Sequence, residues 1–119
     1  MAKASSSIAA DRIAAYDRLI ALVPGLDRKG ATVPYTSTNG NMSSYLDATG
    51  SLALRLGPDD RERFLRQYDA RLQEAYGTVQ KEYVRVPVAL LDDTAELGPW
   101  FRASDAWVSS LKPKPTKRR

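Results

Sequence analysis

The chain has 119 residues, 43% hydrophobic and 27% charged, a balance that is ordinary for one soluble globular domain. It has no histidine and no cysteine, which excludes disulfides, thiol nucleophiles, histidine-based catalytic triads and the usual structural zinc sites. The net charge of +4 is unevenly placed. The last eight residues, KPKPTKRR, hold five of the 18 basic residues, and the rest of the chain carries 13 basic against 14 acidic residues.

The first predicted element is a helix that is capped by Ser5, Ser6 or Ser7 and runs to about Val23. Pro24-Gly25 ends it. Apolar side chains recur every three or four residues and form one stripe: Ala9, Ile13, Tyr16, Ile20 and Val23. The favoured interpretation is that this stripe packs on the protein's own sheet, and the alternative is a partner-binding surface.

Residues 31–56 predict a three-stranded antiparallel meander. Asn39-Gly40 and the segment from Asp47 to Gly50 are the two turns. Pro34 cannot donate to a neighbouring strand, so the first strand should lie at the edge of the sheet or be bulged. Alternation along the strands predicts six inward side chains: Val33, Tyr35, Leu46, Leu52, Leu54 and Leu56.

Gly57-Pro58-Asp59-Asp60 is typical of a helix start, because proline fits the first turn and acids suit its positive end. This helix presents Phe64, Leu65 and Tyr68 on its buried side. Its arginines, Arg61, Arg63, Arg66 and Arg71, alternate with acidic residues. That pattern favours a self-paired solvated face over a phosphate-binding stripe.

Two strands follow, a short one from Leu72 to Tyr76 and a longer one from Lys81 to Val86. One helical turn is predicted over Val88 to Leu91. A last helix then starts with an Asp93 to Glu96 capping box and runs to about Leu111. Pro99 either kinks that helix or begins a second one. The apolar stripe of the last helix comprises Leu97, Trp100, Phe101, Ser104, Trp107, Val108 and Leu111. The two tryptophans are interpreted as core and dimer-packing groups.

The elements in order predict an α+β fold, a two-layer sandwich of α-β(3)-α-β(2)-α type with a five-stranded antiparallel sheet. Residues 1–111 form its single domain, and residues 112–119 form a disordered basic tail. No catalytic, cofactor-binding or metal-binding residue is predicted. The adjacent acids Asp59-Asp60 and Asp92-Asp93 stand at helix starts, which favours a structural role over magnesium binding.

Four segments carry a resemblance to a known family: NGNM at Asn39 to Met42, GSLALRLGPDDRERF from Gly50, KEYVRVPVALLDDTAELGPWF from Lys81, and SDAWVSSLKPKP from Ser104. In these segments the chain resembles the bacterial TfoX N-terminal domain family. Residues 29–35 are nearer to the related YdhG-like and YjbR-like domains. The resemblance implies a fold like that of the type III secretion chaperones, and it implies no enzymatic activity.

The sequence therefore predicts a cytoplasmic, non-enzymatic interaction or regulatory module, which pairs with itself or with another protein. The candidates for its partner or ligand surface are Pro34, Thr36, Asn39, Asn41, Ser43, Tyr45 and Arg55. One alternative is a small-ligand-binding domain in which the polar members of this set converge beside the last helix.

A second alternative is a nucleic-acid-associated protein that uses its tail. The candidate polyanion contacts are Lys112, Lys114, Lys117, Arg118 and Arg119. An acidic lipid surface would be held by the same charges, but a merely solubilising tail is the favoured interpretation. No stretch of the sequence is apolar for long enough to cross a membrane.

Overall fold

The computed structural model describes residues 8–30, 32–75 and 77–113. Within them the chain forms four helices and five strands. Their bounds are α1 Ala10–Ile20, β1 Tyr35–Thr38, β2 Asn41–Leu46, β3 Leu52–Arg55, α2 Pro58–Gln67, β4 Arg71–Ala75, β5 Thr78–Val86, α3 Val88–Leu91 and α4 Thr94–Ser109. The strands make one open sheet in the order β1-β2-β3-β5-β4, and every neighbouring pair is antiparallel. The predicted α+β class, element order and five-stranded antiparallel sheet are confirmed.

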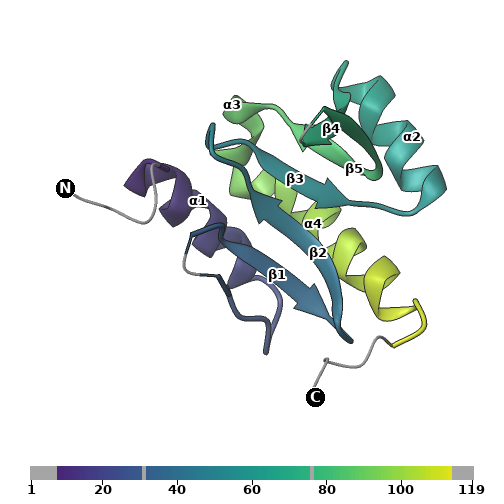
Figure 1. The fold of residues 1–119 in the computed structure, drawn as a ribbon, viewed down its shortest axis with the longest axis horizontal. Coiled ribbons are helices and arrows are strands. Elements are labelled where there is room, and N and C mark those ends of the chain that lie inside the picture. The colour runs from purple at the N-terminus through teal and green to yellow at the C-terminus, as the bar shows by residue number, and fades with distance from the viewer. Residues whose placement is uncertain (1–7, 31, 76, 114–119) are drawn as a thin grey trace.

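The sheet presents its two faces to different surroundings. Helices α1 and α4 lie behind it in Figure 1, where α4 contacts β1, β2 and β3 and also packs against α1 and α3. Helix α2 lies beside β5, toward the β4 end of the sheet. The opposite face, which looks toward the viewer, has no helix over it among the described residues. We call it the open face.

The turn between β1 and β2 is the predicted Asn39-Gly40 hairpin. Both residues have positive φ values, 55° and 80°, as a two-residue turn of this kind requires. Asn39 and Asn41 donate from their side-chain amides to the carbonyl oxygens of Ser109 and Lys112, at 3.2 and 3.1 Å. The hairpin is therefore attached to the end of α4.

The predicted phase of the first strand is wrong. Leu46, Leu52, Leu54 and Leu56 are fully buried as expected, but Val33 is 47% exposed and lies outside β1. Tyr35 pairs with Tyr45, whereas Thr36 pairs with Ser44 and is fully buried on the helix side. Strand β1 is an edge strand, as Pro34 predicted, although Pro34 itself precedes it.

The reversal has a physical cause in a group of buried hydroxyls, which we call the hydroxyl network. Thr36 Oγ1 lies 2.6 Å from Ser44 Oγ and 2.7 Å from Ser43 Oγ. The Tyr16 hydroxyl of α1 lies 2.6 Å from Ser44 Oγ, and Ser104 of α4 donates to the Ser43 carbonyl oxygen at 3.3 Å. Burial raises the pKa of Tyr16 to about 12, with its hydrogen bonds to Ser44 and Thr36 opposing the rise. Five polar side chains thus share the buried space between the sheet and helices α1 and α4, and Thr36 takes the inward place that a simple apolar-inward rule leaves to Val33 and Tyr35.

Helix α1 packs on the sheet through Ala15, Tyr16, Leu19 and Ile20. The predicted stripe is partly correct, because Ala9 is exposed while Ile13 and Val23 are only half-buried. The predicted serine caps, Ser5 to Ser7, lie outside the described residues.

The second half of the chain largely follows its pattern. Helix α2 begins at Pro58 as predicted, and α4 runs through Pro99 as one helix. Asp93 caps α4 by accepting from the Glu96 backbone N–H at 3.1 Å. Helices α2 and α4 meet through the tilted and edge-on rings of Phe64, Tyr68 and Trp100.

Most arginines of the α2 region have partners within the molecule. Arg63 pairs with Asp60, Arg66 lies 3.9 Å from Glu62, and Arg61 donates to the Leu56 carbonyl oxygen at 3.0 Å. The fourth, Arg71, is not on α2 but begins β4. These contacts favour the self-paired interpretation of the arginine pattern.

The last two strands depart most from the prediction. Strand β5 begins at Thr78, three residues earlier than expected. Its pairing with β4 shifts abruptly, because Leu72 lies opposite Val84 whereas Gln73 lies opposite Gln80. An irregularity of this kind bends a hairpin. The predicted end of β4, Tyr76, lies outside the described residues.

A cleft on the open face

The bent β4–β5 hairpin encloses a cleft on the open face. The Tyr45 hydroxyl of β2 donates to Gln80 Oε1 of β5 at 2.5 Å, although β3 lies between these two strands in the sheet. Tyr45 lies opposite Ala53, which lies opposite Arg85, so Gln80 is five residues along β5 from the position level with Tyr45. The contact therefore requires the start of β5 to bend back over the open face. The resulting cleft has a volume of about 520 Å³.

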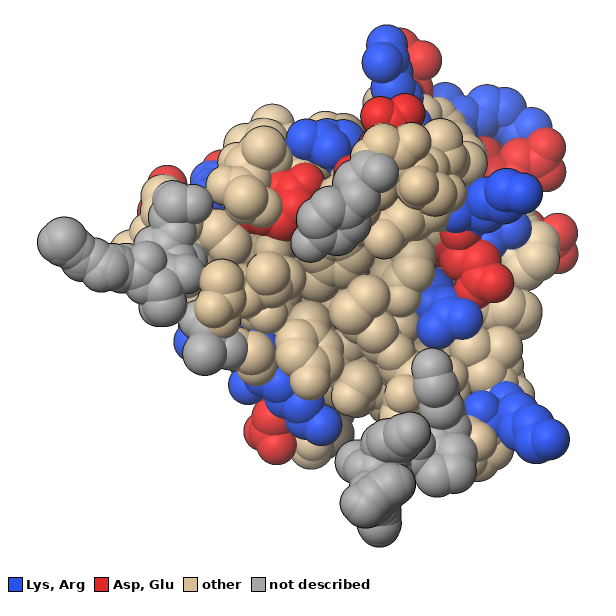
Figure 2. Space-filling view, viewed as in Figure 1, with Lys and Arg blue, Asp and Glu red and all other residues tan. Residues whose placement is uncertain are grey.

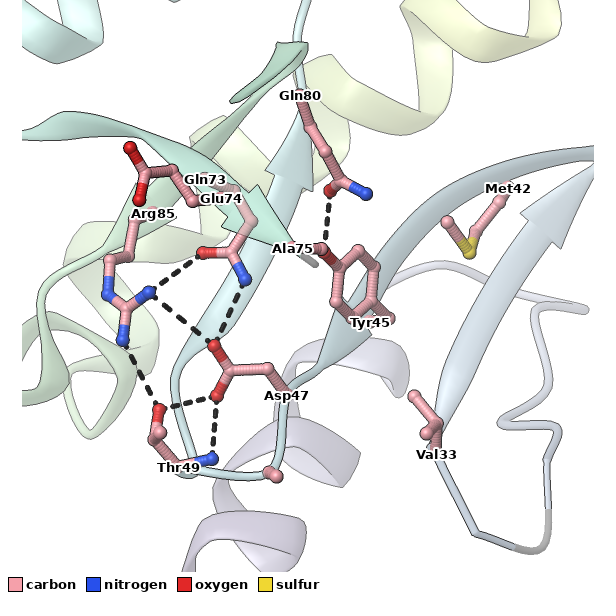
Figure 3. A pocket seen from close by; sticks show the side chains of 11 residues that line it. Val33, Met42, Tyr45, Asp47, Thr49, Gln73, Glu74, Ala75, Gln80 and Arg85 are labelled. Atoms are coloured by element: carbon pink, nitrogen blue, oxygen red, sulfur yellow. Dashed lines mark hydrogen bonds and ion pairs between the residues drawn. The ribbon is translucent and has the colours of Figure 1, made fainter. Parts of the chain in front are cut away.

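The two ends of the cleft differ in chemistry, as Figure 3 shows. At one end, apolar groups come from β2, from the segment before β1 and from β4; they are Tyr45, Met42, Val33 and Ala75. At the other end, Asp47, Thr49, Gln73 and Arg85 are joined by dashed lines. Figure 2 shows that most of the middle of this face carries neither acidic nor basic side chains. The site therefore has an apolar floor and one polar end.

Asp47 is the centre of the polar end. Its Oδ1 accepts from the Thr49 backbone N–H at 2.9 Å, from the Thr49 hydroxyl at 2.5 Å and from the Ser51 backbone N–H at 3.1 Å. Its Oδ2 accepts from Gln73 Nε2 at 3.0 Å. Burial alone would raise the pKa of Asp47, but these hydrogen bonds outweigh it and lower the pKa below the ordinary value of 3.8.

Gln73 and Arg85 complete the polar end. The Gln73 side chain is almost fully buried and is satisfied at both ends, since its Oε1 accepts from Arg85 at 3.2 Å. Arg85 also donates to the Thr49 hydroxyl oxygen at 3.3 Å, and its Nη1 lies 3.6 Å from Asp47 Oδ2. Three elements, the β2–β3 turn, β4 and β5, are thereby held in one arrangement.

Only one of the seven predicted surface residues, Tyr45, lines the cleft. Arg55 lies on the same face but outside it, where it donates to Glu82 Oε1 at 2.7 Å and stacks over the Tyr83 ring at 5.8 Å. Thr36 and Ser43 belong to the buried hydroxyl network. The structure thus does not bring the set together as one surface.

The other three lie apart from the cleft. Asn39 and Asn41 bind the end of α4, so these two do lie beside the last helix. Pro34 is buried, and its carbonyl oxygen accepts from the Leu46 backbone N–H at 2.9 Å. Lys112 of the predicted tail is exposed, whereas Lys114, Lys117, Arg118 and Arg119 lie outside the described residues.

Sequence reasoning missed Asp47, Gln73 and Arg85. The sequence identifies Asp47 only as a turn residue. The local pattern Asp-Ala-Thr-Gly does predict that its carboxylate accepts hydrogen bonds from the backbone of its own turn. Its partnership with Gln73 and Arg85 depends on the irregular β4–β5 register, which alternation alone does not predict.

Neither a metal site nor a membrane span emerges from the described segments. They hold no group of three or more acidic, histidine or cysteine side chains that is able to bind a metal ion. Both predicted acid pairs have structural contacts, since Asp92 accepts from Arg12 at 2.6 Å and Asp60 pairs with Arg63. None of the helices described is long and apolar enough to span a bilayer.

Comparison with known proteins adds no relative. No family model matches the chain, and searches of curated proteins and of solved structures return no match. Membership of the TfoX-like group, and the likeness to secretion chaperones that it implies, remain predictions.

The Asp47 hydrogen bonds predict a pH-dependent contribution to stability. Asp47→Asn should lower the unfolding free energy by about 2 kcal/mol at neutral pH, because it removes the charge that accepts these bonds. Folding lowers the pKa of Asp47 below its ordinary value of 3.8. The stabilisation is therefore fully present above pH 3.8 and is lost as the pH falls through the lower pKa of the folded state. Urea unfolding at several pH values should therefore show the unfolding free energies of wild type and Asp47→Asn converging once the pH is below the folded-state pKa of Asp47.

The exposed Asp27, with no ion pair or hydrogen bond in the described structure, supplies the matched control. Asp27→Asn should change stability little at any pH. A difference between Asp47→Asn and wild type that stays constant across the acid range would contradict the role given to the charge.

Proposed function

We propose that this protein is a non-catalytic binding module that holds a small molecule in the open-face cleft. The observation that supports this proposal is the shape and lining of the cleft. Its volume of about 520 Å³ falls within the range of about 300–1,000 Å³ that is usual for ligand sites, which are mostly apolar with a few fixed polar groups. Tyr45 and Met42 supply an apolar floor, and Arg85 and Gln80 supply polar atoms at fixed places.

The chemistry of the polar end supports binding rather than catalysis. A general base needs a pKa near the working pH and a free lone pair. Asp47 has a depressed pKa and accepts four hydrogen bonds, so it is a weak base. Arg85 offers hydrogen-bond donors and no acceptor, so it does not serve as a base.

Met42 allows a direct test, because it lines the cleft and the chain has only two methionines. Protein labelled with ¹³C at the methionine methyl groups should show a saturable shift of the Met42 signal when benzyl alcohol is added. Ala48→Phe places a ring at the cleft and should weaken binding by about fivefold or more, the equivalent of about 1 kcal/mol.

Ala89→Phe is the matched control, since Ala89 is an exposed alanine of α3 that does not line the cleft. It should leave the affinity unchanged. No shift of Met42 at any probe concentration, or equal weakening by both variants, would contradict the proposal.

An interaction module remains the second candidate, and the observation in its favour is the β4 edge. Strand β4 ends the sheet, and no described strand pairs with its outer side. The β1 edge is partly occupied instead, because Lys29 and Tyr35 exchange two backbone hydrogen bonds of 2.8 and 2.9 Å beside it. A free edge can add a strand from a second copy or from another protein.

The solution mass separates the two candidates. A module that only binds a small ligand should scatter light as the 13.1 kDa monomer over a wide concentration range. A mass that rises toward twice this value with concentration would favour strand addition at β4 by a second copy.

A further inference from the structure

The polar atoms that line the cleft are unequally available to a ligand. Both carboxylate oxygens of Asp47 are occupied by donors from Thr49, Ser51 and Gln73. The Gln80 carbonyl oxygen accepts from the Tyr45 hydroxyl. The acceptors of the polar end are therefore already used by the protein.

Apart from the exposed carboxylate of Glu74, the remaining capacity consists of donors. A guanidinium carries five N–H groups. Arg85 donates hydrogen bonds to two oxygens, on Gln73 and Thr49, and its Nη1 also forms an ion pair with Asp47 at 3.6 Å. Its side chain is 40% exposed, so further N–H groups can reach a molecule in the cleft. The Gln80 amide nitrogen also has no partner in the described part of the chain. A ligand that fits this site must bring an acceptor.

The charge of the lining limits what kind of acceptor this is. Asp47 and Glu74 contribute two carboxylates against the single guanidinium of Arg85, so an anionic acceptor meets a net negative wall. A cationic ligand is attracted by this lining, but Glu74 is exposed, so water weakens the attraction. Such a ligand also brings only donors, so the available N–H groups of Arg85 gain no acceptor. An uncharged carbonyl oxygen avoids both costs.

We infer that the cleft binds an uncharged amphipathic molecule, with an aromatic or aliphatic body on Tyr45, Met42 and Val33 and a carbonyl oxygen that accepts from Arg85. Figure 3 shows the two halves of this arrangement on either side of the cleft. The inference rests on the proposed binding function and specifies the chemical class of its ligand.

Three probes of nearly equal size and different charge test the inference on the wild-type protein. They are 2-phenylacetamide, which is neutral, phenylacetate, which is anionic, and 2-phenylethylamine, which is cationic. Dissociation constants are measured at neutral pH from the Met42 methyl shift. The neutral amide should bind about fivefold or more tightly than either charged probe, a difference of about 1 kcal/mol.

A pair of matched variants tests the role of Arg85. Arg85→Lys keeps the charge but loses the fixed donor geometry, and it should remove most of the preference for the amide. Arg55→Lys makes the same change on the same face outside the cleft, and it should leave the preference intact. An NMR spectrum of the backbone amides shows whether each variant is folded. The probe series on the wild-type protein does not depend on either variant.

The outcomes separate the inference from the function on which it rests. Tighter binding of either charged probe, or equal binding of all three, would overturn the inference but leave the cleft as a binding site. Loss of the preference in Arg55→Lys as well as Arg85→Lys would also overturn the role of Arg85. If no probe moves Met42, both the inference and the proposed function fail.

Discussion

Hydroxyl groups buried between the sheet and the helices decide which way β1 and β2 face. Thr36, Ser43, Ser44 and Tyr16 satisfy one another over distances of 2.6 to 2.7 Å. A buried hydroxyl without a partner costs about 1–3 kcal/mol. Shifting β1 by one residue would turn Thr36 to the open face and leave the Tyr16 and Ser44 hydroxyls with fewer partners. The hydroxyl network therefore fixes the register of β1 against β2 and also stabilises the fold.

The open face is a consequence of that register. With Thr36 and Ser44 directed toward the helices, Tyr35 and Tyr45 are directed away from them. Tyr45 then meets the bent β4–β5 hairpin at Gln80, and Asp47, one residue after β2, meets Gln73 and Arg85. The floor and the polar end of the cleft thus both depend on how β2 is placed.

The sequence predicts much of the fold for local reasons. Asn39-Gly40 and Gly57-Pro58 mark a turn and a helix start through backbone preferences that tertiary contacts do not override. Alternating Leu52, Leu54 and Leu56 identify the core side of the central strand. These features depend on residues close together in the chain.

What the sequence does not predict depends on contacts between distant residues. The phase of β1 follows from the hydroxyl of Tyr16, 20 residues before Thr36, and apolar patterning assigns a threonine to the surface by default. The cleft follows from the shift that places Gln73 opposite Gln80. Neither the Tyr16–Ser44–Thr36 contacts nor the shifted β4–β5 pairing produces a periodic pattern in the sequence.

Thiol reactivity tests the register of β1 most directly, because the natural chain has no cysteine. Two single-cysteine variants, Val33→Cys and Thr36→Cys, are treated with a thiol reagent in the folded and the urea-unfolded state. The network predicts that Val33→Cys reacts nearly as fast folded as unfolded. Thr36→Cys should react about 100-fold more slowly when folded, which corresponds to a local opening free energy of about 2.7 kcal/mol. The reverse result, a protected thiol at position 33 and a reactive one at position 36, would contradict the account.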